Sequence, residues 1–475
     1  MLIAMLGLLT TTTAFADMPA PLAEQIAKLT AADAAASDLF GFSVALSGTT
    51  ALVGAHLDSD DGASSGSAYI FERDEGGAGN WGQVAKLTAA DAAFSDQFGW
   101  SVALSGTTAL VGAYGDTDGG VTSGSAYIFE RDEGGAGNWG QVAKLTAADA
   151  AADDTFGISV ALSGTTALVG ARLDDDAGAS SGSAYIFERD EGGAENWGQV
   201  AKITASDAEA GDYFGQVVAL SGTTALVGAW NDDDGGDASG AAYIFERDEG
   251  GAENWGQIAK LTADDAGAGD YLGYSVALSG TTGLVGAWND GDGGLQSGAA
   301  YIFERDEGGA GNWGQVAKLT AADPAVEDSF GFAVAVRGTT ALVGSRFDDD
   351  AGIDSGSAYV FERDEGGPGN WGQVAKLTAA DGAAGDQLGI SVALSDTIGL
   401  VGAWNDDDGG NNSGSAYAFS IGESPAPLLR IPTAIAAGAT PVDVPVILTT
   451  HGAALASTAF SIDYDEACLA RISHQ

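Results

Sequence analysis

Residues 27–84 read "AKLTAADAAASDLFGFSVALSGTTALVGAHLDSDDGASSGSAYIFERDEGGAGNWGQV", and this stretch decides the fold because the chain repeats it with few changes. Its Lys28 returns every 58 residues, as Lys86, Lys144, Lys202, Lys260, Lys318 and Lys376. Each unit holds four short β-like runs (FSVALS, TALVGA, SAYIFER and GQVAKLT) with Gly, Asp, Ser and Asn between them, and no helical stripe. Four short strands repeated seven times predict an all-β fold, a seven-bladed β-propeller.

The two ends of the repeat region predict a closed ring. Six units carry "NWGQV" or, in one of them, "NWGQI", whereas the last runs "SAYAFSIGESPAP" and lacks this strand. A matching run, "AEQIAKLT" from Ala23 to Thr30, stands ahead of the first unit instead. We therefore expect the N-terminal strand to complete the seventh blade, which removes an open sheet edge, and we place the propeller at residues 22–421.

The segments outside the repeats suggest export and a second domain. Residues 1–16 contain an apolar run that ends in Ala14-Phe15-Ala16, a small-x-small pattern typical of a signal peptide, although no Lys or Arg precedes the run. This pattern predicts a secreted or cell-surface protein. Residues 422–441 are rich in Pro and Ala and are predicted to be a linker. Residues 442–475 show β-alternation and resemble the opening strands of a cohesin-like β-sandwich, here as a truncated fragment.

Composition excludes several classes of partner. The chain has 67 acidic and 18 basic residues, a net charge of −49, so phosphate backbones and anionic lipids are repelled. No later run reaches the roughly 18 unbroken apolar residues of a membrane span, so direct membrane insertion is not expected. The single cysteine, Cys468, rules out a disulfide framework within the chain.

The run "LFGFSVALSGTTALVGA", Leu39 to Ala55, resembles the FG-GAP repeat, best known from the propeller of integrin α subunits. Phe-Gly begins at Phe40, Phe98, Phe156, Phe214 and Phe330, and is replaced by Leu-Gly at Leu272 and Leu388. The resemblance implies a seven-bladed propeller and, by analogy, an extracellular binding or adhesion role. It does not carry over the family's calcium sites. Those lie in an Asp-rich loop between the first two strands, where this sequence has only "SGTT" from Ser47 to Thr50.

Two acidic loops per unit are expected on one face of the ring, because alternate connections between up-and-down strands emerge on the same side. They are "HLDSDDGASSG" (56–66) and "TAADAAASDLFG" (30–41). Asp-x-Asp followed by Gly suits Ca²⁺, but the same residues also form Asx-turns without any ion. The candidate metal ligands are Asp58, Asp60, Asp116, Asp118, Asp174, Asp176, Asp232, Asp234, Asp290, Asp292, Asp348, Asp350, Asp406 and Asp408. Calcium is thus one interpretation of these loops, and structural turns are the other.

Three positions vary while the frame around them stays constant. The slot after the second strand holds His56, Tyr114, Arg172, Trp230, Trp288, Arg346 and Trp404. The position before Phe-Gly includes Tyr213 and Tyr271, and the position after it includes Phe42, Trp100, Tyr274 and Phe332. Aromatic residues and Arg anchor interfaces, and aromatic faces stack on sugars. We therefore expect the seven slot residues, together with Trp100, Tyr213 and Tyr271, to bind a protein or carbohydrate, although they could instead cap the core.

Catalytic motifs are missing from the sequence, so we do not expect an enzyme. The three histidines are His56, His451 and His474, and "GASSG" at residues 62–66 sits in a Gly/Ser loop rather than in a strand-turn-helix elbow. The leading hypothesis is a binding or adhesion module without a certain cofactor. The alternatives are a structural spacer in an envelope or extracellular assembly, and a module that depends on calcium.

Overall fold

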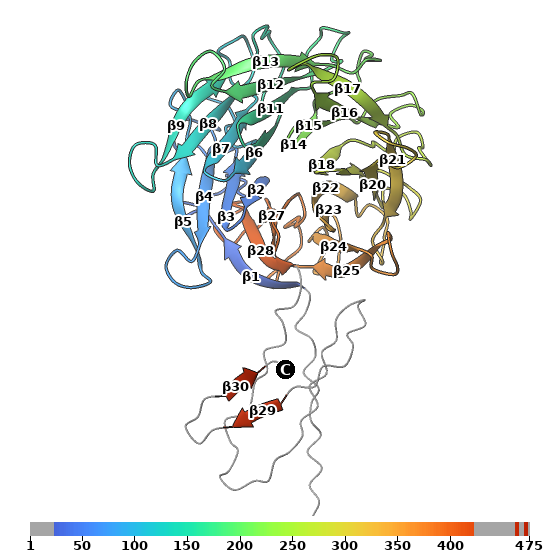
Figure 1. Ribbon diagram of the computed structural model, residues 1–475. Helices are drawn as coiled ribbons and strands as arrows, with labels where there is room; N and C mark the ends of the chain where they lie inside the picture. Colours follow the sequence, from blue (N-terminus) through green and yellow to red (C-terminus); the bar gives the residue numbers. More distant parts are fainter. Residues whose placement is uncertain (1–22, 422–460, 465–469, 474–475) are drawn as a thin grey trace, which may run out of the picture. The chain divides into compact units, whose positions relative to one another are not determined.

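The computed structural model describes residues 23–421, 461–464 and 470–473 (Figure 1). In the first of these ranges, seven four-stranded antiparallel sheets stand around a central axis as the blades of a ring, and no helix occurs. The prediction of an all-β, seven-bladed propeller is confirmed. None of the described residues belongs to a helix with the length and hydropathy of a membrane span.

Each position in a blade is filled by corresponding segments of the repeat. The innermost strands, which surround the axis, are β2 (Ser43–Ser47), β6 (Ser101–Ser105), β10 (Ser159–Ser163), β14 (Val217–Ser221), β18 (Ser275–Ser279), β22 (Phe330–Arg337) and β26 (Ser391–Leu394). The second strands are β3 (Thr50–Ala55), β7 (Thr108–Ala113), β11 (Thr166–Ala171), β15 (Thr224–Ala229), β19 (Thr282–Ala287), β23 (Thr340–Ser345) and β27 (Ile398–Ala403).

The outer half of each blade follows the same order. The third strands are β4 (Ser67–Arg73), β8 (Ser125–Arg131), β12 (Ser183–Arg189), β16 (Ala241–Arg247), β20 (Ala299–Arg305), β24 (Ser357–Arg363) and β28 (Ser415–Ile421). The outermost are β5 (Trp81–Leu87), β9 (Trp139–Leu145), β13 (Trp197–Ile203), β17 (Trp255–Leu261), β21 (Trp313–Leu319), β25 (Trp371–Leu377) and β1 (Ala23–Leu29).

The N-terminal strand β1 completes the seventh blade, as the sequence predicts. It pairs antiparallel with β28, from Ala23 opposite Ile421 to Leu29 opposite Ala416. This ladder has a β-bulge near Gln25. The outer ladder of each of the other six blades has one at the same place, which in the first blade lies between Ile70 and Phe71. The first and last strands of the propeller thus share one sheet, and the ring has no open seam.

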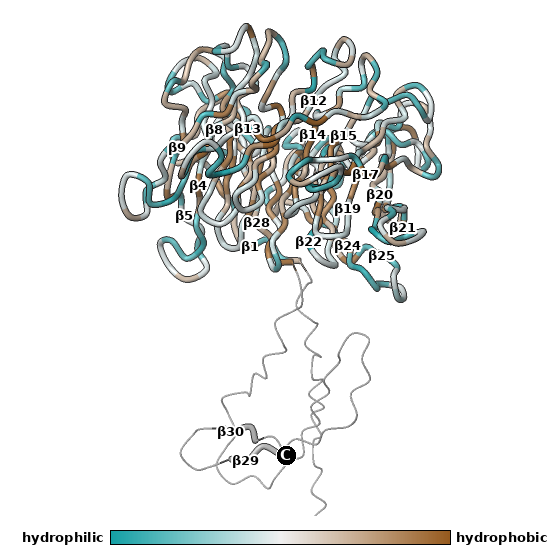
Figure 2. The backbone as a smooth tube through the Cα atoms, turned by 45° about the horizontal axis from the view of Figure 1, so that its top comes forward, coloured by the Kyte–Doolittle hydropathy of each residue, from teal (hydrophilic) through white to brown (hydrophobic). Residues whose placement is uncertain are grey.

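The core lies between blades rather than inside them. Successive residues of a strand point to opposite faces, so β4 sends Tyr69 and Phe71 into the cluster shared with the seventh blade and Ala68 and Ile70 into the cluster shared with the second. Because both faces are covered, the inner strands are apolar almost throughout. Figure 2 shows this as brown strands around the axis and teal loops at the periphery.

The Phe-Gly pair clamps each blade to the one before it. Phe98 is fully buried, packs edge-on against Tyr127 and Phe129, and forms a parallel bridge with Gly66 of the preceding blade. Gly99 has φ +91°, and a Cβ there would lie 2.2 Å from the Ser67 carbonyl oxygen, so only glycine fits. Equivalent bridges join all neighbouring blades, and Phe40 to Gly414 closes the ring.

A second unit, Pro425–Gln475, contains the antiparallel pair β29 (Ser461–Tyr464) and β30 (Ala470–Ser473). The signal peptide predicted at residues 1–16 and the linker predicted at 422–441 lie outside the described residues. The cohesin-like assignment of 442–475 stays a prediction.

Candidate functional site

Both acidic loops of each unit lie on one face of the ring, which we call the loop face. It is formed by residues 56–66, residues 30–41 and their copies. Across each blade junction the two loops hydrogen-bond through their backbones: Ser95 donates to the Ala63 carbonyl at 3.0 Å, and Gln97 donates to the Ser64 carbonyl at 3.2 Å. The predicted sharing of one face is therefore correct. The opposite face, with the "SGTT" turns, we call the hairpin face.

Each blade carries an ion cluster on the loop face. In the first blade the Lys86 ammonium lies 2.7 Å from Asp33, 3.0 Å from Asp58 and 2.6 Å from Asp60. Tyr69 donates its hydroxyl hydrogen to Asp58 at 2.7 Å, and the ammonium sits 5.3 Å from the centre of the Tyr69 ring. The lysines that occupy this position are Lys28, Lys86, Lys144, Lys202, Lys260, Lys318 and Lys376.

The pKa values in these clusters reflect close pairing. Burial alone would lower the pKa of Lys86, but hydrogen bonds from its ammonium to Asp33 and Asp60 raise that pKa well above its usual range. Burial pushes the pKa of Asp33 upward, and the Lys86 contact reverses this, so the net shift is downward. Lys86 and Asp33 are therefore both charged at neutral pH.

The aspartates do converge as a metal site would require, but around a lysine. In five blades one oxygen from each of the three carboxylates lies within 4.8 Å of the others, for example Asp149, Asp174 and Asp176. Lys202 is hydrogen-bonded to all three. Three carboxylates suit a hard cation such as Ca²⁺, yet the ion would have to displace the ammonium. Calcium at the aspartates named from the sequence stays a prediction.

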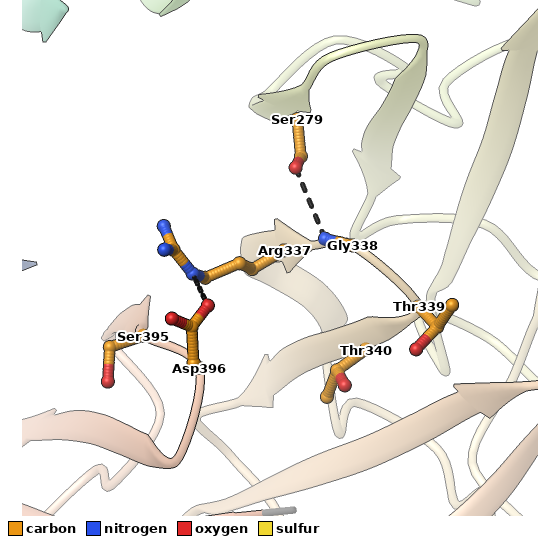
Figure 3. Close-up of a pocket in the computed structure, with 7 residues that line it drawn as sticks. All are labelled: Ser279, Arg337, Gly338, Thr339, Thr340, Ser395 and Asp396. Atoms are coloured by element: carbon orange, nitrogen blue, oxygen red, sulfur yellow. Dashed lines mark hydrogen bonds and ion pairs between the residues drawn. The ribbon is translucent and has the colours of Figure 1, made fainter. Parts of the chain in front are cut away.

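The place of the family's calcium loop is occupied by the turns of the hairpin face. The turn between β2 and β3 offers no carboxylate, and the one departure among the seven is Asp396. In the neighbouring turn, that of blade six, Arg337 replaces the usual Ser and donates to Asp396 of blade seven (Figure 3). In five other junctions a Ser hydroxyl accepts from the Gly amide of the next blade, as Ser279 does from Gly338 at 3.2 Å.

Two shallow hollows open on the hairpin face. One has a volume of about 500 Å³ and is lined by Ser279, Arg337, Gly338, Thr339, Thr340, Ser395 and Asp396 (Figure 3). The other, about 350 Å³, is the end of the central channel, ringed by the last residues of the inner strands. Their linings combine hydroxyl groups with a single ion pair.

The variable residues meet at the loop-face end of the inner and second strands and form what we call the mouth cluster. On one side Phe42 contacts His56, Trp100 and Trp404, with ring centroids 4.3, 4.5 and 5.7 Å away, and Trp100 contacts Tyr114 at 4.7 Å. These residues belong to blades seven, one and two. The predicted positions are thus brought together across three blades.

The other side of the mouth cluster spans blades four to six. Tyr213 stacks on Trp230 at 5.3 Å with an interplanar angle of 14°, and Trp230 contacts Tyr271 edge-on at 5.0 Å. Trp288 contacts Tyr271 at 5.5 Å. Further along, the Arg346 guanidinium lies 3.9 Å from the centre of the Phe332 ring. Blade three lies between the two sides. Its variable residue is Arg172, which donates a hydrogen bond to Gln216 at 2.8 Å.

The seven variable residues that follow the second strands differ in burial. His56 is only 4% exposed, so it supports the cluster from within and is the least able to touch a ligand. Burial also lowers the pKa of His56 to about 3, which keeps it neutral near pH 7. The other six are half-buried. Burial lowers the pKa of Arg346 as well, from the high value typical of a guanidinium, because its main neighbours are aromatic rings.

Some residues that complete the site were not among the predicted ligands. Phe42, Tyr274 and Phe332 bridge slot residues of adjacent blades, although only Trp100 was named from their position. Their variability was a sequence signal that could have identified them. The third aspartate of each ion cluster, Asp33 and its copies, was also missed. Its recurrence every 58 residues was visible, but its contact with lysine was not.

The fold and its junctions define a β-propeller built from seven tandem repeats. The FG-GAP repeat model matches all seven, at residues 23–71, 81–129, 139–187, 197–245, 255–303, 313–361 and 371–419. The chain therefore belongs to the FG-GAP repeat family, as the resemblance in the sequence indicated. A comparison with curated proteins gave no match.

Proposed function

We propose that this protein is an exported, non-enzymatic binding or adhesion module that holds a protein or glycan partner on its loop face. The observation that carries the proposal is the contrast between the constant packing residues of the repeat and the variable residues of the mouth cluster. Seven units keep their packing residues almost constant, and the residues that vary gather at one end of the channel. In a repeat protein each unit packs on a near-identical neighbour, which explains the constant frame but not the choice of large aromatic residues at the variable positions.

The mouth cluster has the composition of an interface. Trp230, Trp288 and Trp404 are half-buried, so each has one side fixed by neighbouring rings and another side accessible. Tryptophan and arginine that are preorganised in this way lose little conformational entropy on binding. Contacts from several blades to one partner add up by multivalency. The family's common role as a binding or adhesion module supports the same conclusion by analogy.

The experiment compares the full chain with the variant Trp230→Ala/Trp288→Ala/Trp404→Ala. Both are tested on an array of immobilised glycans and by affinity capture of extracellular proteins identified by mass spectrometry. We expect a partner whose affinity falls by about tenfold or more in the variant. The control is Arg337→Ser/Asp396→Gly, which restores the common turn sequence on the hairpin face and should bind as the parent does. If no partner distinguishes parent from variant, the spacer hypothesis is favoured.

A further inference from the structure

Large apolar side chains are exposed almost only on the loop face. Within residues 23–421, six large hydrophobic residues are exposed, and five of them belong to loops of this face: Phe94 (75% exposed), Val121 (69%), Leu295 (68%), Val326 (59%) and Ile353 (73%). The sixth, Val142, lies on the outer strand β9 and is much less exposed. Scattered exposed apolar residues are normal on proteins, but this concentration on one face is not scattered.

The five residues occupy only two positions of the repeat. Val121, Leu295 and Ile353 stand at the tip of the loop between the second and third strands, where other blades have Ala63, Ala179, Asp237 and Asn411. Phe94 and Val326 stand in the loop between blades, where the other units have Ala. Since the other blades fold with small or polar residues here, the large apolar side chains are not needed for folding.

The two positions are neighbours across a blade junction, and in one junction both are large and apolar. Glu327 donates its amide hydrogen to the Leu295 carbonyl at 2.9 Å, which places Val326 beside Leu295. At the next junction Gly385 donates its amide hydrogen to the Ile353 carbonyl at 2.9 Å, so Ile353 lies one blade further along the same face. We call Leu295, Val326 and Ile353 the tip patch. Phe94 and Val121 are exposed singly, at the two junctions on either side of blade two.

Carboxylates surround the tip patch. Asp292 and Asp350 belong to the ion clusters of the same two blades, and Glu327 and Asp349 are exposed beside them. Each lysine of this face offsets only part of that charge, because a single ammonium is paired with three aspartates. A second copy of the chain would present the same negative face and be repelled, as would nucleic acid and anionic lipid.

We propose that the tip patch is the docking surface for a cationic protein segment that has apolar side chains among its lysines or arginines. The apolar tips insert between the partner's apolar groups, and the surrounding carboxylates attract its basic ones, which gives orientation and fast association. This inference rests on the proposed function, since it specifies the partner class of the same face, but it assigns the contact to residues outside the mouth cluster.

The test uses the full chain and two fluorescent peptides of equal length and charge, one alternating Lys with Leu and the other Lys with Ser. Binding is followed by fluorescence anisotropy at matched ionic strength. The variant is Leu295→Ala/Val326→Ala/Ile353→Ala, which introduces a residue that other blades already have at these positions and leaves the charge unchanged. Val142→Ala is the control, because it removes an exposed apolar side chain outside the loop face.

We expect the Lys–Leu peptide to bind the parent and the control equally, and to lose about tenfold in affinity on the tip-patch variant. The Lys–Ser peptide should bind weakly and equally to all three. Equal affinity of the two peptides, or an unchanged Lys–Leu affinity in the variant, would overturn the proposal, because charge alone would then explain binding.

Two further experiments distinguish this proposal from a lipid-binding surface and from peptide binding at the mouth cluster. Binding to zwitterionic phosphatidylcholine vesicles that is lost in the tip-patch variant would identify a lipid surface and overturn the protein assignment. The triple tryptophan variant should retain the Lys–Leu peptide. If it loses the peptide while the tip-patch variant keeps it, the mouth cluster is the contact, so the proposed function survives and this inference fails.

Discussion

At the scale of single residues, the lysine in each ion cluster is the most strongly coupled charge on the loop face. We predict that Lys202→Met lowers the free energy of unfolding by about 2 kcal/mol, because it leaves the buried Asp174 beside Asp149 and Asp176 without a counter-charge. Part of the full cost is avoided because Asp149 and Asp176 are largely exposed. Urea denaturation at fixed salt measures the change.

A matched control exists on the hairpin face. Arg337→Ser removes an ion pair in which both side chains are more than half exposed, and it should leave the free energy of unfolding nearly unchanged. Lys202→Arg, which keeps the charge, should lie between this variant and the methionine variant. Equal effects of Lys202→Met and Arg337→Ser would show that the clusters are not coupled to folding.

His56 gives the molecule a predictable response to acid. Its folded pKa, about 3, lies below its unfolded value near 6.5, so between these values the unfolded chain binds more protons. Stability from this residue is complete above pH 6.5 and falls as the pH drops toward 3. Between pH 7 and pH 5 the loss should be about 2 kcal/mol.

The measurement is urea denaturation of the parent and of His56→Phe at pH 7 and pH 5. The difference between the two proteins isolates His56 from Asp212, whose pKa is raised by burial to about 6 and which therefore titrates in the same range. A difference that does not change with pH would contradict the assignment of His56 as a buried neutral side chain.

At the scale of elements, the strand that closes the ring should matter more than its length suggests. Deleting residues 1–30 removes β1, exposes the edge of β28, and takes Lys28 away from Asp406 and Asp408. We predict a melting temperature lower by roughly 10 °C or more, together with association through the free edge. Differential scanning calorimetry and light scattering measure both effects.

The comparison protein lacks only residues 1–22, which leaves β1 intact. It should melt with the parent and remain in the same oligomeric state. If the longer deletion also behaves like the parent, closure by β1 does not stabilise the ring.

The strand pattern was predictable from sequence because the relevant signals are local. Short β-like runs between clusters of Gly, Asp, Ser and Asn predicted the four strands, and the displaced "AEQIAKLT" run predicted the ring closure. The side-chain contacts were not predictable in this way. Asp33, Asp58 and Lys86 are separated along the chain and meet only because a blade junction and an outer strand place them together. Similarly, the position of Phe42 showed variation in the sequence, but its contacts with Trp100 and Trp404 depend on three blades.

At the scale of the whole molecule, an ammonium group lies among three aspartates in each of the seven blades, including the five in which the carboxylates converge as a cation site would require. We therefore predict that Ca²⁺ does not raise the melting temperature of the full chain beyond a Mg²⁺ control at matched ionic strength. Lys202→Met should behave differently, because it frees the carboxylates of Asp149, Asp174 and Asp176, which already lie within 4.8 Å of one another. A single site filled at a hundredfold excess over Kd stabilises by about 2.7 kcal/mol, so Ca²⁺ should recover the stability lost in this variant.

Scanning calorimetry in EDTA and in added Ca²⁺ distinguishes the possibilities. A calcium-specific increase in the variant alone would show that lysine and calcium compete for one set of oxygens, and that this chain uses the built-in cation. An increase in the parent of the same size would mean that Ca²⁺ displaces the ammonium or binds other oxygens of the Asp58 and Asp60 loops. The calcium-dependent module would then replace the lysine-stabilised ring as the description of the loop face.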